Sequence, residues 1–267
     1  MLLAIRHTTR YAYAAPGSFA VHRLRLTPAG NRMQRILEWR LEAPGLETAA
    51  DYTDGFGNRT HLVASAEPHS EWAVTAAGLV ETEDRGGLVG TPEEAASPAV
   101  FLRSTPLTAV SPEMEAFAHG IQGATTLAKL HALLEGIAGH VAYDTDATHA
   151  GTTAAEAFER RSGVCQDHTH IFVAASRRLG IPARYVTGYL HLATEELEAA
   201  HHAWAEAWVE DLGWVGFDAA NRICPTEHYV RLACGLDAPS AAPITGVRRG
   251  GGGERLDVNV VVQQQQQ

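Results

Sequence analysis

The stretch at residues 161–190, RSGVCQDHTHIFVAASRRLGIPARYVTGYL, joins a helix signal to a strand signal. Ser162 can cap a helix over roughly residues 164–179, and the Gly-Ile-Pro sequence that follows ends it. The apolar, β-branched and aromatic residues after the proline predict a strand over Ala183–Leu190. Helices followed by strands are typical of an α+β fold.

Cys165 falls in the first turn of this predicted helix. Free backbone N–H groups and the positive end of the helix dipole lower the pKa of a thiol there and favour the nucleophilic thiolate. The alternative is a small buried apolar residue, which is what most lone cysteines are. That second interpretation is the expected one for Cys224 and Cys234, which lie in an irregular region.

A second candidate group lies in the sequence HHAWAEAW at 201–208. On a strand, His202 shares one face with two tryptophans and can serve as a general base. Asp218 ends the next predicted strand, and it lies diagonal to His202 if residue 209 pairs with residue 213. A one-residue slip would put the two side chains on opposite faces. The spacing permits an Asp–His contact without requiring it.

The rest of the chain divides into a strand-rich and a mixed part. Strand signals cover residues 2–13, 19–27, 37–41 and 72–81, with tight-turn sequences at 54–58, which predicts a small β-sandwich or barrel. Residues 83–100 are rich in Gly, Pro, Ser and acidic residues and are the best linker candidate. Helix signals follow at 112–121 and 127–141, and a third helix is predicted after a capping box at Thr153 and Glu156. Further strands are predicted at 202–209, 214–218 and 256–262.

Composition narrows the class of partner. The 267 residues are 45% hydrophobic, and 21 Lys and Arg against 31 Asp and Glu give a net charge of −10. This balance argues against nucleic acid or an anionic membrane as the partner. No apolar run approaches the ~18 residues of a membrane span, and the N-terminus does not read as a signal peptide. Three cysteines are an unlikely disulfide framework, so we expect a cytoplasmic protein.

Three ordered motifs resemble the transglutaminase-like superfamily. Residues 161–190 resemble its cysteine signature, HAWAEAW at 202–208 its histidine motif, and GWVGFDAANR its aspartate motif. YAYAAP at 11–16, RLRLTP at 23–28 and DGFGN at 54–58 resemble the β-rich N-terminal region of bacterial members. The chain departs from the family at Ala219-Ala220, where Pro-Thr usually follows the aspartate, at His168, and at the later Cys234–Asp237 segment.

The resemblance implies a papain-like fold with a catalytic triad. Cys165 corresponds to the nucleophile, His202 to the base and Asp218 to the residue that orients the base; His201 has no implied role. It also implies a sandwich-like N-terminal domain with linker over 1–100 and a catalytic domain over 101–262. The low-complexity glutamines at 263–267 predict a disordered tail. No cofactor and no metal are expected, and the oligomeric state stays open.

The implied chemistry is acyl transfer from a peptide or glutamine-type amide through a thioester. Water as acceptor gives a protease or amidase, which we favour, and an amine acceptor gives a crosslinking transferase. Two other interpretations stay open. The first is a metal site, whose possible ligands lack the usual zinc spacings and are Cys165, Asp167, His168, His170, His201 and His202. The second is a binding module that keeps the fold without the chemistry.

Overall fold

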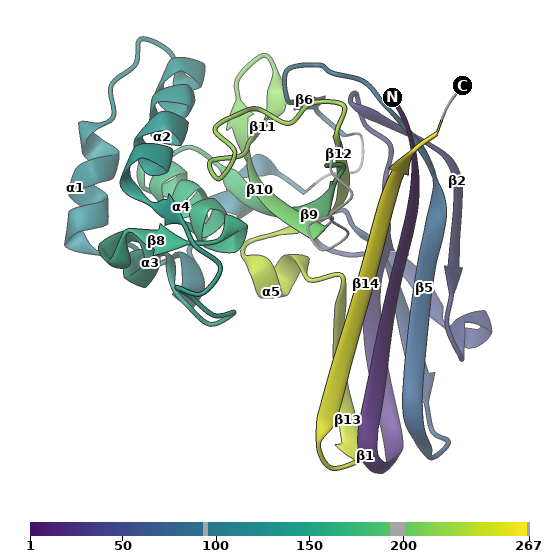
Figure 1. Ribbon diagram of the computed structural model, residues 1–267. Helices are drawn as coiled ribbons and strands as arrows, with labels where there is room; N and C mark the ends of the chain where they lie inside the picture. The colour runs from purple at the N-terminus through teal and green to yellow at the C-terminus, as the bar shows by residue number, and fades with distance from the viewer. Residues whose placement is uncertain (93–95, 193–200, 266–267) are drawn as a thin grey trace.

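The computed structural model describes residues 1–92, 96–192 and 201–265, and its strands form two antiparallel sheets and one short parallel pair. Figure 1 shows the long strands on one side of the molecule and the helices on the other. The first sheet contains β1 (Leu2–Thr27), β2 (Gln34–Glu42), β3 (Ala50–Thr53), β4 (Arg59–Ser65), β5 (His69–Thr82), β13 (Ile244–Gly250) and β14 (Glu254–Gln264). The second has the order β12-β9-β10-β11-β6, with β6 (Leu88–Gly90), β9 (Ala183–Leu190), β10 (His201–Val209), β11 (Gly213–Phe217) and β12 (Tyr229–Gly235).

The helices lie mainly between residues 112 and 178. They are α1 (Pro112–Gly120), α2 (Thr126–His140), α3 (Ala154–Arg160), α4 (Cys165–Arg178) and the short α5 (Ala238–Ala241). Two-residue strands β7 (Ala142–Tyr143) and β8 (Ser162–Gly163) pair in parallel, and 3₁₀ turns occur at Leu46–Thr48, Pro98–Leu102 and Pro106–Thr108. The predicted caps at Ser111 and at Thr153 with Glu156 are confirmed.

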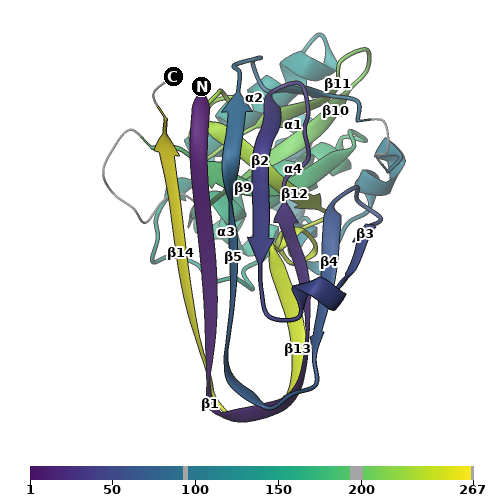
Figure 2. The same ribbon diagram turned by 90° about the vertical axis from the view of Figure 1, so that its right-hand side faces the viewer.

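β1 is one long strand that curls back on itself, as Figure 2 shows. Its first half pairs with β5 and β14, and its second half pairs with β4 and β13. Leu3 and Ile5 from the first half share a buried core with Leu24 and Leu26 from the second. Apolar side chains that alternate along both halves therefore meet between two layers. The predicted α+β class with a sandwich-like β region is confirmed.

Two sequence-based expectations differ from this sheet. Residues 2–13 and 19–27 were expected as separate strands, but the curl keeps the backbone extended through the residues between them. Gln263 and Gln264 were expected in a disordered tail, but they continue β14 opposite Ala4 and Leu3. Ladder hydrogen bonds use only the backbone, so polar side chains do not end the pairing. Residues 266–267 of the predicted tail lie outside the described residues.

Strand pairing also crosses the predicted domain boundaries. β13 and β14, assigned from the sequence to the catalytic part, pair with β1. Residues 83–100, expected as a linker, contribute β6, which pairs with β11. The division at residue 100 stays a prediction, but β13 and β14 return the chain to the first sheet.

α4 is the central helix of the mixed part and is buried on almost every side. It packs against α1, α2 and α3 and against strands β9 and β10. Phe172 of α4 stacks on Phe217 of β11, and Ala205 and Ala207 of β10 belong to the same core. Small residues on the strand let the helix approach closely, so the first turn of α4 is held at a fixed place on the sheet. Among the described helices, none is long and apolar enough to cross a membrane.

Candidate active site

Cys165 is the first residue of α4 and is half-buried. The expected cap, Ser162, is not used: it lies in β8, and Val164 occupies the N-cap position. Asp167 takes over the capping role, because its Oδ2 accepts hydrogen bonds from the Val164 backbone N–H at 2.9 Å and from Thr148 Oγ1 at 2.6 Å. The predicted placement of the sulfur in the first turn holds, with a different capping residue.

The β10–β11 hairpin brings His202 to Asp218. Val209 pairs with Gly213, which is the register that puts the two side chains on one face. His202 Nε2 donates to Asp218 Oδ2 at 2.6 Å, and the side chains are 8% and 1% exposed. This bond uses Nε2 and leaves Nδ1 for a second partner. Neighbouring His201 points elsewhere, with its Nε2 3.0 Å from Thr187 Oγ1.

The protonation of His202 links all three residues. Burial by itself lowers the pKa of His202, but hydrogen bonds and negative charge from Asp218 and Cys165 outweigh it and raise that pKa from 6.5 to about 10. Burial raises the pKa of Asp218, and the protonated His202 and its other donors lower it by more. The structure thus brings the cysteine at the start of α4 within interaction range of the hairpin pair, with the imidazole favoured as a cation.

Asp218 is held by several donors that the sequence did not single out. Its Oδ2 accepts from Tyr229 Oη at 2.8 Å and from Asn221 Nδ2 at 2.8 Å. Its Oδ1 accepts from the backbone N–H groups of Ala220 and Asn221 at 3.1 and 3.2 Å. The unusual Ala219-Ala220 sequence therefore still forms a turn that closes over the carboxylate. Asn221 three residues after an aspartate was a usable turn signal, whereas Tyr229 lies in β12, a strand that the sequence did not indicate.

Aromatic rings surround the pair. The Trp204 ring lies 6.4 Å from the His202 ring in a stacked arrangement, and the Tyr229 ring lies 6.0 Å from it, edge-on. Tyr143 pairs through its backbone with Gly163, two residues before Cys165, and its side chain is 56% exposed. Burial and the charges of Cys165 and Asp218 raise the pKa of Tyr143. Trp204 and Tyr229 therefore shelter the imidazole, which is 8% exposed.

The metal interpretation does not fit the described residues. His168 Nδ1 lies 2.9 Å from the Val164 carbonyl oxygen and His168 Nε2 lies 3.1 Å from the Val141 carbonyl oxygen, so both ring nitrogens are occupied. His170 accepts from the Ala238 backbone N–H. Within the described part of the chain, no group of three or more His, Cys, Asp or Glu side chains is placed to hold a metal ion.

Comparison with known proteins shows the family. A model described as the transglutaminase-like superfamily matches residues 115–219, and one described as the bacterial transglutaminase-like N-terminal region matches residues 3–81. The chain belongs to the transglutaminase-like superfamily. An uncharacterized protein of Mycobacterium leprae is 30% identical to this transglutaminase-like chain, over 97% of the chain and 98% of that protein.

Two further relatives carry descriptions. A solved structure from Cytophaga hutchinsonii, described as a "putative cysteine protease", is 25% identical with a TM-score of 0.75 and covers 98% of this chain and 90% of its own. A protein-glutamine gamma-glutamyltransferase of Pseudomonas aeruginosa is 32% identical over 77 residues, which are 26% of this chain and 11% of that protein. The expected papain-like, transglutaminase-like core is confirmed, and at the level of the superfamily it supports a thiol enzyme.

Proposed function

We propose that this transglutaminase-like protein is an acyl-transfer enzyme that uses Cys165 as nucleophile, His202 as acid and base, and Asp218 to orient the histidine. The observation that carries the proposal is the 2.6 Å bond from His202 to a buried carboxylate, together with the upward pKa shift of His202 to which Cys165 contributes. A nucleophile, a base and an orienting group in contact are the arrangement that covalent catalysis needs. The substrate would be a peptide or a glutamine-type amide.

In the first half-reaction, the Cys165 sulfur attacks the amide carbonyl carbon and forms a C–S bond. The negative charge moves to the carbonyl oxygen, beside the backbone N–H groups at the start of α4. His202 then gives its proton to the leaving nitrogen as the C–N bond breaks, and a thioester remains. In the second half-reaction, neutral His202 accepts a proton from the acceptor as it attacks the thioester, and sulfur leaves.

The acceptor decides between two products. Water gives a carboxylic acid, and an amine gives a new amide. We favour hydrolysis, because Cys165 is half-exposed and water is always present, whereas amine transfer requires water to be kept out. The resemblance of one segment to a protein-glutamine gamma-glutamyltransferase supports the amine alternative.

Alkylation tests whether the site is chemically competent. We expect iodoacetamide at pH 7 to modify Cys165 at least about tenfold faster than a free thiol, because the helix N-terminus and protonated His202 place positive charge beside the sulfur. Mass spectrometry of tryptic peptides identifies the modified cysteine. Cys224 is the internal control, since burial and Asp84 raise its pKa to about 11. A rate at Cys165 no faster than that of free cysteine would instead favour a binding module.

Tyr229 is a positioning residue in this scheme, because it donates to Asp218 and acts on the base through it. We expect Tyr229→Phe to lower kcat about three- to tenfold and leave KM unchanged, as one of several donors to the carboxylate is lost. Tyr189→Phe is a matched control, because its buried hydroxyl bonds to His7 instead. Equal kcat losses in both variants would indicate a general effect on folding.

A further inference from the structure

A cavity of about 420 Å³ lies where the N-terminal sheet meets β9 and β12. Its walls come from the loop after β1, from β3, from the turn at residues 54–58 and from the segment around β6. Arg184 and Arg231 line it, and neither touches Cys165, His202 or Asp218 through a described hydrogen bond. Cys165, His202 and Asp218 are not among the residues that line this cavity.

Two arginines at this cavity share a single carboxylate. Glu206 Oε2 accepts from Arg184 Nε at 2.5 Å, and Glu206 Oε1 accepts from Arg231 Nε at 2.9 Å. The side chains of Arg184, Arg231 and Glu206 are 1%, 14% and 0% exposed. Burial raises the pKa of Glu206, but the two guanidinium groups lower it by more and keep it ionised. The cluster therefore carries one buried positive charge in excess.

The charges at the mouth of the cavity do not compensate this excess. Arg59 Nη2 and Asp51 Oδ2 lie 2.7 Å apart, and these half-exposed side chains form a neutral pair on the cavity wall. Burial lowers the pKa of Arg184, whereas at Arg231 the charge of Glu206 outweighs burial and raises the pKa. An unpaired buried charge is costly, so an anion in the cavity would stabilise the cluster.

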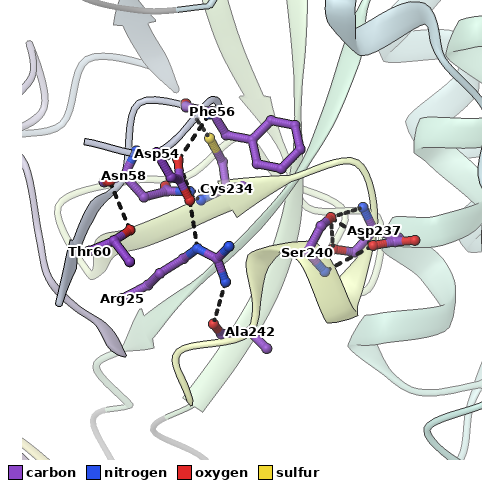
Figure 3. Close-up of polar contacts among 9 residues, drawn as sticks. All are labelled: Arg25, Asp54, Phe56, Asn58, Thr60, Cys234, Asp237, Ser240 and Ala242. Atoms are coloured by element: carbon purple, nitrogen blue, oxygen red, sulfur yellow. Dashed lines mark hydrogen bonds and ion pairs between the residues drawn. The ribbon is translucent and has the colours of Figure 1, made fainter. Parts of the chain in front are cut away.

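The cavity is held in shape before any ligand arrives. The guanidinium carbon of Arg184 lies 4.0 Å from the centre of the Trp214 ring, which fixes its plane. The turn at residues 54–58 is fastened to β12 (Figure 3), because the Asn58 side chain exchanges two 2.8 Å hydrogen bonds with the Cys234 backbone. Asp54 in the same turn accepts from Arg25 Nε at 2.7 Å. A fixed wall lowers the entropy cost of binding.

We propose that this cavity binds a small organic carboxylate, whose charged group contacts Arg184 and Arg231 and whose apolar body lies against Tyr52 and Phe56. Guanidinium groups have the fork geometry that matches a carboxylate. Tyr52, Phe56, Val89 and Pro92 supply the apolar part of the lining. The carboxylate has two possible sources, a free acid or the C-terminus of a peptide.

Isothermal titration calorimetry on the full chain tests the proposal with matched probes. Benzoate is compared with benzamide, and acetyl-Gly-Phe with its C-terminal amide. We expect at least one acid to bind and its neutral partner to bind at least about tenfold more weakly, because only the acid compensates the charge. Tighter binding of the peptide acid than of benzoate assigns the site to chain termini, and the reverse order assigns it to free acids. Equal binding of acids and amides, or no binding of either acid, overturns the proposal.

Variants of the exposed residues at the mouth of the cavity test whether its charge sets the affinity, without altering the buried core. Asp51→Asn removes a negative charge and is expected to raise the affinity for the acid about three- to tenfold, and Arg59→Gln to lower it by a similar factor. Arg40→Gln is the control, since Arg40 forms an exposed pair with Glu42 away from the cavity. Affinities unchanged in both Asp51→Asn and Arg59→Gln would contradict the proposed site.

A last comparison separates the cavity from the candidate active site. Cys165→Ser is expected to bind the acid as the unchanged protein does, and the acid is expected to leave the alkylation rate of Cys165 unchanged. Loss of binding in Cys165→Ser, or protection of Cys165 by the acid, would place the ligand in the active site and overturn the proposal. Failure of the thiol chemistry would leave these binding results standing.

Discussion

Cys165→Ser is expected to lower turnover of a glutamine-containing peptide by at least about 10³-fold, since no other described thiol lies beside His202. A serine hydroxyl is a far weaker nucleophile than a thiolate and is not ionised beside a protonated histidine. Turnover is measured twice, as release of ammonia and as incorporation of a primary amine. Ammonia leaves in the first half-reaction with either acceptor, so the amount of amine incorporated per ammonia released is near one for amine transfer and near zero for hydrolysis.

Cys224→Ser provides the matched control for this variant. Cys224 is another half-buried thiol, but it packs against the core and its raised pKa keeps it protonated at neutral pH. The turnover of Cys224→Ser is expected to stay within about twofold of that of the unchanged protein. If Cys165→Ser kept most of the activity, covalent catalysis by this residue would be wrong.

The second large effect is expected from Asp218→Asn, which preserves the shape of the side chain and removes its charge. We expect kcat to fall about 10²- to 10⁴-fold, because the imidazolium loses its compensating charge and its orientation. The pKa of His202, raised to about 10 in the unchanged protein, is expected to fall. The histidine therefore stays protonated through pH 8 in the unchanged protein and loses its proton at lower pH in the variant.

Nuclear magnetic resonance of ¹³C-labelled histidine rings measures this shift directly, and the spectrum of His202→Gln assigns the signal. Asp257→Asn is the control, because Asp257 is exposed on β14 and far from the site in sequence and sheet. A titration of His202 that is the same with and without the Asp218 charge would show that the carboxylate does not set the state of the base.

The local pattern predicted much of the mixed part of the fold. The boundaries of β9 were predicted to the residue, because an apolar run between Pro182 and a polar segment leaves little choice. The hairpin at β10 and β11 was also predicted, with the register left open between two alternatives. Tight turns at positive φ, here at Asp211 and Gly213, depend on the backbone and decided that register.

Contacts between segments far apart in the chain could not be predicted from the sequence. Tyr229 binds Asp218 from a strand that lacks a clear alternating pattern, and β13 and β14 join a sheet that begins more than 200 residues earlier. The charge cluster of Arg184, Glu206 and Arg231 likewise forms only in the folded protein, because its members lie on three different strands. Pairing of this kind depends on backbone hydrogen bonds and total packing, which no short stretch of residues encodes.

The sequence by itself determined the family, the α+β class and the identity of the candidate cysteine, histidine and aspartate, because side-chain chemistry and short-range periodicity are local properties. The tertiary structure alone decided that His202 bonds to Asp218, that Asp167 rather than Ser162 caps the cysteine helix, and that β14 joins the first sheet. Distances, burial and charge balance arise only when remote segments exclude water together, and these quantities set the protonation of the base and the excess charge at the arginine cavity.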